Sequence, residues 1–263
     1  MRAKFGPAGN SDRFSKEHKS SLAAPQWIAD FGLDCYEYQC GKGVHVGEET
    51  CRKLGENARA AGISLSLHAP YFINLANPDP DSLQKTIGYI TAACEAADWM
   101  GSTRVIIHSG ALMKRTRREA LDIALRSLKA VIAACDGQGF GHIALCPETM
   151  GKINQLGDLD EVLELCTLDE RLVPCVDFGH LYARSLGADD GLEAMVCMLD
   201  RVEAVLGRVR VDEHVMSPLR EGEIARSPGM KYRHYAPSAR TVIYEGEPAR
   251  VIPAICARYD EAM

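Results

Sequence analysis

Residues 63–108 read ISLSLHAPYFINLANPDPDSLQKTIGYITAACEAADWMGSTRVIIH. The stretch begins and ends with short β-rich runs, Ile63–His68 and Arg104–His108, which are typical of strands in a covered parallel sheet. Between them, Ser82–Met100 carries apolar residues at three- and four-residue spacing, which indicates a helix. A strand, a helix and another strand in this order predict two parallel strands joined by a helical crossover.

The same alternation of short strands and long helices continues along the rest of the chain. Further strands are expected at Ala3–Gly6, Cys35–Gln39, His142–Glu148, Leu172–Asp177, Arg208–Asp212 and Thr241–Glu245, and further helices at Glu48–Ala61, Arg115–Cys135, Leu159–Leu165 and Gly191–Leu206. Eight such cycles in 263 residues fit a fold of about 250 residues. We therefore predict an α/β fold, a single-domain (β/α)8 TIM barrel over residues 1–263. Prolines and glycines interrupt the stretch Glu213–Arg240, so the seventh helix is expected to be short or missing.

The charge balance and the cysteine pattern limit the classes of function. The chain has 30 Lys and Arg against 36 Asp and Glu, a formal net charge of −6, so nucleic-acid binding would need a local basic patch or bound cations. The first residues lack the apolar core of a signal peptide and no apolar run approaches about 18 residues, so we expect a cytoplasmic protein without membrane contact. Ten cysteines are scattered without a C-x₂-C pair, which favours reduced, mostly buried thiols. Those inside apolar segments include Cys94, Cys146, Cys175, Cys197 and Cys256.

Polar side chains close most of the predicted strands. In a (β/α)8 barrel the active site lies at the C-terminal ends of the strands. The residues at or just after these ends are His68, His108, Glu148, Asp177, His180, His214, His234 and Glu245. A single histidine at such a place is more often a capped or solvated loop residue, but the whole set is a ligand mix suited to zinc, manganese or iron. Because converging carboxylates repel one another unless cations lie between them, we predict a metal site.

Several segments resemble one family closely. Residues 66–75, SLHAPYFINL, resemble the third-strand signature of the endonuclease IV family (AP endonuclease family 2), which belongs to the xylose-isomerase-like TIM barrels. The resemblance continues in VIIHSG (105–110), PETMGK (147–152), VDFGH (176–180) and weakly IYE (243–245), and at the start of the chain in FGPAGN (5–10) and YEYQC (36–40).

The resemblance implies a zinc-dependent enzyme that cleaves DNA on the 5′ side of an abasic site, a step of base excision repair. By position, His68 and His108 would bind one zinc and the catalytic Glu148 would bridge it to a second. Asp177 and Glu245 would complete the second site, and His180 and His234 would hold a third ion. The expected cofactor is two or three Zn²⁺, with Mn²⁺ or Mg²⁺ as alternatives. The expected partner is damaged double-stranded DNA, and no obligate protein partner is inferred.

Two segments are candidates for DNA binding. Tyr71 and Phe72, with Asn74 after them, match the loop that enters the DNA in the family. Arg115 belongs to the basic run KRTRR (114–118), which follows His108 and would lie at the rim of the site, where it could meet a phosphate backbone. The alternatives are that the aromatic rings pack against the next helix and that the basic run is a solvated helix start.

The last third of the chain departs from the family pattern. Arg210 stands where a histidine ligand is expected, and His214 could replace it only if the strand register shifts. Tyr232 stands where the family has an aspartate two residues before His234. The third metal site therefore lacks some of the expected ligands. The protein could hold two metals, bind the third metal weakly, or act on another substrate. The competing functions are a sugar isomerase or epimerase of the xylose-isomerase-like class, and a metal- or DNA-binding descendant that has lost catalysis.

Overall fold

The computed structural model describes residues 3–189 and 191–207. They all lie in one compact unit, Met1–Ser227, and the second unit, Pro228–Met263, is outside the described residues. The strands and the shortened helix predicted after residue 207 also lie outside them, as do Cys256 and the site candidates Arg210, His214, Tyr232, His234 and Glu245. The extent of the domain over residues 1–263 therefore stays a prediction.

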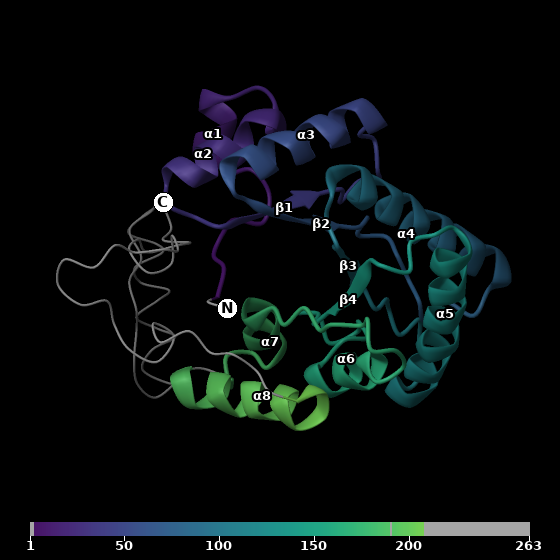
Figure 1. The fold of residues 1–263 in the computed structure, drawn as a ribbon. Helices are drawn as coiled ribbons and strands as arrows, with labels where there is room; N and C mark the ends of the chain where they lie inside the picture. The colour runs from purple at the N-terminus through teal and green to yellow at the C-terminus, as the bar shows by residue number, and fades with distance from the viewer. Residues whose placement is uncertain (1–2, 190, 208–263) are drawn as a thin grey trace, which may run out of the picture. The chain divides into compact units, whose positions relative to one another are not determined.

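Four parallel strands form the sheet, in the order β1-β2-β3-β4 (Figure 1). They are β1 (Cys35–Gln39), β2 (Ser64–His68), β3 (Arg104–His108) and β4 (Ala144–Glu148), which confirms four of the predicted strands to within two residues at each end. Gln39 pairs with His68, and His108 pairs with Glu148, so the polar strand ends share one edge of the sheet. Between β2 and β3, His68 pairs with Ile106, the kind of stagger that lets a parallel sheet close into a barrel.

An extended segment lies on each side of this sheet, where further strands were predicted. The prediction of a strand at Ala3–Gly6 is wrong, because this end of the chain pairs with β1 through one isolated bridge, between Ala8 and Glu37. The segment predicted as Leu172–Asp177 likewise has one bridge, from Cys175 to Glu148. Each pairing lacks one N–H donor at a proline, which is Pro7 in the first segment and Pro147 of β4 beside the second.

Long helices follow the strands and cover the outer face of the sheet (Figure 1). The predicted helices are present as α3 (Glu48–Ala61), α4 (Pro80–Met100), α5 (Arg117–Gly137), α6 (Leu159–Cys166) and α8 (Gly191–Leu206). The helices α1 (Asp12–Glu17), α2 (Ala24–Asp30) and α7 (Phe178–Arg184), and the 3₁₀ turn η1 (Ser21–Ala23), were not predicted, and each spans at most seven residues. α5 begins later than expected because Thr116 and Glu119 form a capping box, which leaves Arg115 in the preceding loop.

The core lies between the strands and the outer helices, and it decides which side chains face the interior of the barrel. Val105 and Ile107 belong to the main hydrophobic cluster with residues of α3, α4 and α5. Because side chains alternate along a strand, His108 projects from the opposite face of β3. The same alternation directs Glu148 of β4 away from Leu145, which is also in this cluster. The outer core therefore fixes these two strands while their last residues project into the interior.

The described cysteines follow the expectation of reduced, mostly buried thiols. All nine described cysteines are free thiols, and six of them are buried. Cys197 of α8 is exposed, although it lies in an apolar segment of the sequence. Among the described residues, no helix combines the length and apolar character needed to cross a membrane.

Candidate metal centre

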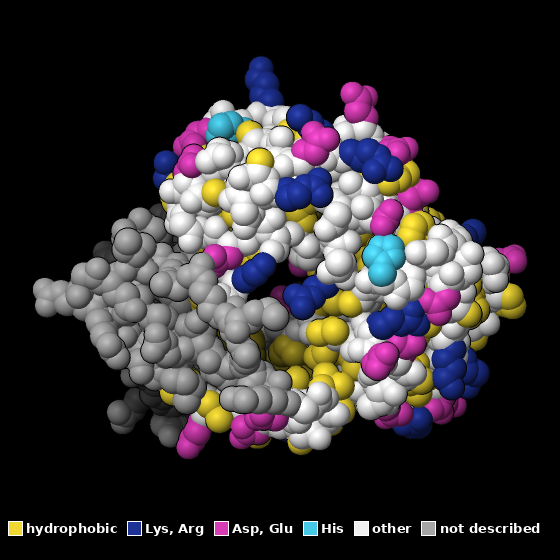
Figure 2. Space-filling view, in the orientation of Figure 1, with side chains coloured by type: hydrophobic (Ala, Val, Ile, Leu, Met, Phe, Trp, Pro, Cys, Tyr) yellow, Lys and Arg dark blue, Asp and Glu magenta, His cyan; other side chains and the backbone are white. Residues whose placement is uncertain are grey.

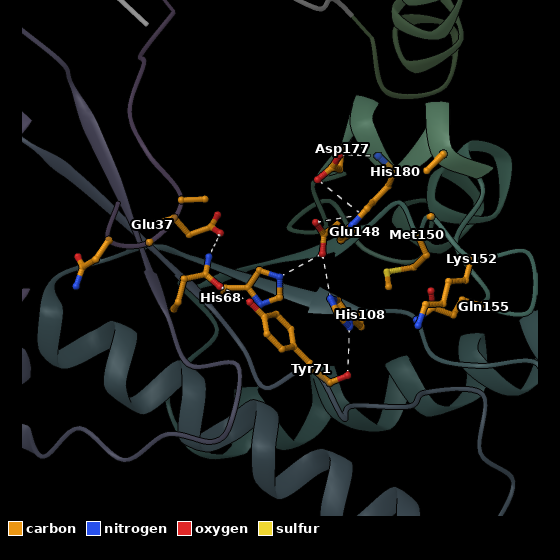
Figure 3. Close-up of a pocket in the computed structure, with 16 residues that line it drawn as sticks. Glu37, His68, Tyr71, His108, Glu148, Met150, Lys152, Gln155, Asp177 and His180 are labelled. Carbon is orange, nitrogen blue, oxygen red and sulfur yellow. Dashed lines mark hydrogen bonds and ion pairs between the residues drawn. The ribbon is translucent and has the colours of Figure 1, made fainter. Parts of the chain in front are cut away.

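Three side chains from neighbouring strand ends meet at one point inside the sheet's polar edge (Figure 3). The Nε2 atoms of His68 and His108 each lie 3.2 Å from the same atom, Oε2 of Glu148. Glu148 is only 7% exposed and His68 only 5%. Two imidazoles and a carboxylate therefore converge where little water can reach.

Backbone carbonyl groups fix the orientation of both imidazoles. His68 Nδ1 lies 2.8 Å from the carbonyl oxygen of Ala69, and His108 Nδ1 lies 3.2 Å from that of Tyr71. A carbonyl oxygen only accepts, so each Nδ1 carries the proton, and in the neutral ring Nε2 presents a lone pair. This is the arrangement in which histidines commonly bind a metal, with the second ring nitrogen held by an outer partner.

The charges of the three groups depend on what lies between them. Burial would raise the pKa of Glu148, but the hydrogen bonds with His108 and His68 outweigh it and hold that pKa at about 2. Burial would lower the pKa of His68, but its hydrogen bond with Glu148 and its contact with the Ala69 carbonyl raise it. Without a metal ion, a protonated His68 thus supplies the positive charge beside the Glu148 carboxylate. A divalent metal ion at the same point would displace that proton.

A second cluster lies on the other side of Glu148. Asp177 is the N-cap of α7 and accepts a hydrogen bond from the backbone N–H of His180 at 2.8 Å. His180 Nδ1 lies 3.7 Å from Oε1 of Glu148, 3.7 Å from Oδ2 of Asp177, and 2.9 Å from the Thr149 carbonyl oxygen. The two side chains are more exposed than the first cluster, at 40% for His180 and 39% for Asp177. Glu148 therefore offers one carboxylate oxygen to each cluster.

Both clusters have the donors of a metal site. Within each set of three residues, one ligand atom from every residue lies within 4.8 Å of the others. The first set, with two imidazoles, suits zinc better than magnesium, which prefers oxygen ligands. The structure brings together the predicted residues His68, His108, Glu148, Asp177 and His180.

The residues predicted to bind DNA lie in different surroundings. Tyr71 is 54% exposed and its ring is stacked on His108, with 5.4 Å between centroids. Phe72 is 50% exposed and packs edge-on against Tyr89 of α4, the packing that the alternative interpretation expects. The Asn74 oxygen accepts hydrogen bonds from the backbone N–H groups of Ala76 and Ala111, so this side chain joins two loops. The Arg115 guanidinium contacts the Met113 carbonyl and lies beyond the residues that line the cavity.

A cavity of about 860 Å³ contains both clusters, and sequence reasoning missed several of its walls. The described lining residues that were not predicted include Asn10, Glu37, Gln39, Met150, Lys152 and Gln155. Two of these residues could have been identified from the sequence. Gln39 is a polar residue at the end of β1, in register with His68, and Glu37 is a charged residue inside a strand. Lys152 is the one Lys or Arg among the described residues of the lining. In Figure 2, Lys and Arg side chains also border the hollow at the centre of the described surface.

A family model described as xylose isomerase-like TIM barrel matches residues 25–221. A second model, the C-terminal domain of threonylcarbamoyl-AMP synthase, matches residues 196–261, which overlap the first match and lie mostly outside the described residues. "Uncharacterized protein MJ0133" of Methanocaldococcus jannaschii is 30% identical over 212 residues, or 80% of this chain and 74% of the relative. "Probable endonuclease 4" of Mycoplasma pneumoniae is 32% identical over 134 residues, or 49% of this chain and 45% of the relative. The chain thus spans less than half the length of that endonuclease relative.

Solved structures of two kinds share the fold. A D-tagatose 3-epimerase-like protein has a TM-score of 0.59 at 22% identity and covers 77% of this chain, which covers 72% of it. Endonuclease IV of Thermus thermophilus has a TM-score of 0.53 at 20% identity, with coverage of 79% and 72%. At these identities the likeness concerns the fold alone, and the side chains of the cavity must distinguish between functions.

Proposed function

The chain belongs to the xylose isomerase-like TIM barrel family, and from this premise we propose that it is a metal-dependent endodeoxyribonuclease of the endonuclease IV type. Its substrate is double-stranded DNA with an abasic site, and the bond hydrolysed is the phosphodiester on the 5′ side. One observation carries the proposal. The carboxylate of Glu148 directs one oxygen to His68 and His108 and the other to His180. A carboxylate shared in this way supports two adjacent cations, the arrangement used for phosphoester hydrolysis.

Each described residue of the two clusters has a role in holding the cations. His68 and His108 supply neutral Nε2 donors to the first, Asp177 and His180 supply donors to the second, and Glu148 serves both. Bound cations supply an activated water and stabilise negative charge on the phosphate and on the leaving oxygen. We propose two or three Zn²⁺, with Mn²⁺ or Mg²⁺ as alternatives. His214, His234 and Glu245 are proposed as further ligands from outside the described residues.

The residues around the cavity would bind the phosphate backbone. Lys152 brings a flexible ammonium group to the lining, which suits a phosphate oxygen. Arg117 and Arg118 pair with Glu161 and Glu164 of α6, so Arg115 and its neighbour Lys114 are the candidates in the basic run. The wall next to His108 is formed by Tyr71, Phe72 and Asn74, which line a separate pocket there. We propose that the substrate enters along this wall.

We also propose that this DNA repair step takes place in the cytoplasm. The free thiols of the described residues agree with a reducing compartment.

The test is cleavage of a duplex oligonucleotide that carries one abasic-site analogue, with added zinc and with a chelator. We expect cleavage on the 5′ side with zinc, none with the chelator, and none with Glu148→Gln. Glu164→Gln, an equal change on the exposed surface of α6, is the matched control and should cleave like wild type. Cleavage that persists in the chelator or in Glu148→Gln would contradict the proposal.

One observation favours a second candidate function, a sugar epimerase or isomerase. Glu37 adds a further carboxyl group to the cavity, and burial, with the nearby charge of Glu148, raises its pKa. A carboxyl group of raised pKa suits proton transfer at a sugar carbon more than contact with a phosphate. Interconversion of ketohexoses with Mn²⁺, in the absence of DNA cleavage, would favour this function. A chain that binds metal and is inactive in both assays would be a lapsed descendant.

A further inference from the structure

We propose that Glu37 and Gln39 are positioning residues that hold Tyr71 across the imidazoles of His68 and His108. The inference rests on the proposed metal centre, and it assigns a role to two residues of β1 that carry no metal. It also changes the role of Tyr71, from a residue free to enter the DNA to a fixed wall of the first metal site.

Two hydrogen bonds connect the three side chains, and Figure 3 labels Glu37 and Tyr71 at the two ends of this line. Gln39 Nε2 donates to Glu37 Oε1 at 2.7 Å, and the Tyr71 hydroxyl donates to Gln39 Oε1 at 2.8 Å. The direction of this line is set at its half-buried end. Oε1 of Glu37 accepts a hydrogen bond from the Gln39 NH₂ group, so the Gln39 amide turns its own oxygen to Tyr71. The phenol must then donate, and its ring takes one position.

That position places the Tyr71 ring against both histidines. The ring is nearly parallel to His108, at 18° and 5.4 Å between centroids, and meets His68 edge-on at 70° and 5.1 Å. The backbone of the same residue takes part as well, because its carbonyl oxygen holds His108 Nδ1 and its N–H donates to the Gly41 carbonyl at 3.1 Å. Tyr71 is thus fixed at its hydroxyl, its ring and its backbone although half of it is exposed.

Gly41 provides the space for this arrangement. A Cβ atom at position 41 would lie 2.2 Å from a ring carbon of Tyr71, so a side chain there would push the ring away from the histidines. β1 and the residues just after it therefore fix the position of the Tyr71 ring in three ways. The Gln39 amide accepts a hydrogen bond from the hydroxyl, the Gly41 carbonyl accepts one from the backbone N–H, and the lack of a side chain at Gly41 leaves room for the ring. The hydrogen bonds that the Gln39 side chain and the Gly41 carbonyl make here go to Tyr71.

The consequence concerns metal binding. Residues that orient a ligand histidine without touching the metal commonly change metal affinity by about 10–100-fold when they are replaced. Gln39 acts through Tyr71, so we expect Gln39→Leu to weaken binding of the tighter metal by about 10-fold, at the lower end of that range. Tyr71→Phe keeps the ring and removes the hydroxyl that Gln39 holds, so it should cause a similar loss.

The experiment is a titration of the metal-free full chain with Co²⁺, followed by the visible absorption of bound cobalt. We expect about 10-fold weaker binding for Gln39→Leu and for Tyr71→Phe, and no additional loss when the two are combined. Gln26→Leu is the matched control, because Gln26 donates to Asp30 at 2.8 Å on the exposed face of α2. It should bind cobalt like wild type. Thermal unfolding identifies any variant that fails to fold, and Tyr71→Phe, the milder change, then carries the test alone.

Three results would overturn the inference. Unchanged affinity in Tyr71→Phe would mean that the hydroxyl does not position the site. Additive losses in the double variant would mean that Gln39 acts by another route. A wild-type chain that binds no cobalt would remove the metal centre, and the positioning role with it. A chain that binds cobalt and shows these coupled losses but does not cut abasic DNA would leave the positioning role intact and refute the nuclease.

Discussion

Replacing Glu148 by Gln should destabilise the metal-free protein more in mild acid than at alkaline pH. At pH 5.5 the carboxylate of Glu148 is ionised and His68, whose pKa is raised, is protonated, so the two attract each other. The fall of the Glu148 pKa from 4.5 to about 2, at about 1.36 kcal/mol per tenfold change in proton affinity, corresponds to about 3 kcal/mol. An amide cannot provide this attraction.

The pH dependence follows from the direction of each pKa shift. A depressed carboxyl pKa contributes stability that is full above 4.5 and is lost as the pH falls toward about 2. The raised pKa of His68 contributes stability that is present below its usual value of 6.5 and is lost as the pH rises through the raised value. The metal-free wild type should therefore gain most from the pair between these limits. Once the pH lies above the raised pKa of His68, the carboxylate faces an unprotonated Nε2 of His68, whereas a glutamine can donate a hydrogen bond to it.

The assay is thermal unfolding of both proteins after complete removal of metal. Since about 1 kcal/mol changes the Tm of a domain near this size by about 2–4 °C, we expect Glu148→Gln to unfold roughly 6–12 °C below wild type at pH 5.5. At pH 8.5 the difference should be smaller, because less of His68 is protonated. Added zinc should raise the Tm of wild type far more than that of the variant. An equal difference at both pH values, without metal, would refute this account of the charges.

The other predictions concern metal retention, the loops and the phosphate. Dialysis against a mild chelator should remove metal in stages, and activity should fall when the first metal is lost. The metal lost first should be the one at Asp177 and His180, because these ligands are more exposed than His68, His108 and Glu148. Loss of all metal in one step would contradict this. Asn74→Ala should lower the free energy of unfolding measured with urea by about 2 kcal/mol, because the backbone N–H groups of Ala76 and Ala111 lose their acceptor. A loss below about 0.5 kcal/mol would mean that the two loops do not depend on the Asn74 side chain. Lys152→Ala should raise the KM for abasic DNA with little change in kcat, and a fall in kcat alone would argue against phosphate binding by this residue.

The sheet and the first metal cluster could be predicted because their signals are local. Strands such as Arg104–His108 stand out against long helices, and each closes on a polar residue that parallel pairing brings to one edge. The same reasoning wrongly predicted a regular strand, Ala3–Gly6, at the start of the chain. There Pro7 allows pairing to β1 at only one isolated bridge, and whole-segment propensity does not resolve a single missing donor.

The wall of the cavity could not be predicted because it depends on cross-strand geometry. Gln39 and Tyr71 are 32 residues apart and meet only through the pairing of β1 with β2. The environment of Phe72 could not be predicted either, because a sequence motif alone does not distinguish a ring that enters DNA from one that packs on Tyr89. Helix α7, which directs Asp177 and His180 toward Glu148, is too short to show a period in the sequence.

The central claim is that the Glu148 carboxylate bridges two cations. The most direct measurement is a crystal structure of the zinc-loaded protein, with anomalous diffraction recorded on both sides of the zinc absorption edge. The account predicts two zinc peaks, one between Glu148 and the imidazoles of His68 and His108, and one between Glu148, Asp177 and His180. A single peak that contacts only one oxygen of Glu148, or zinc bound elsewhere with Glu148 free of metal, would contradict it.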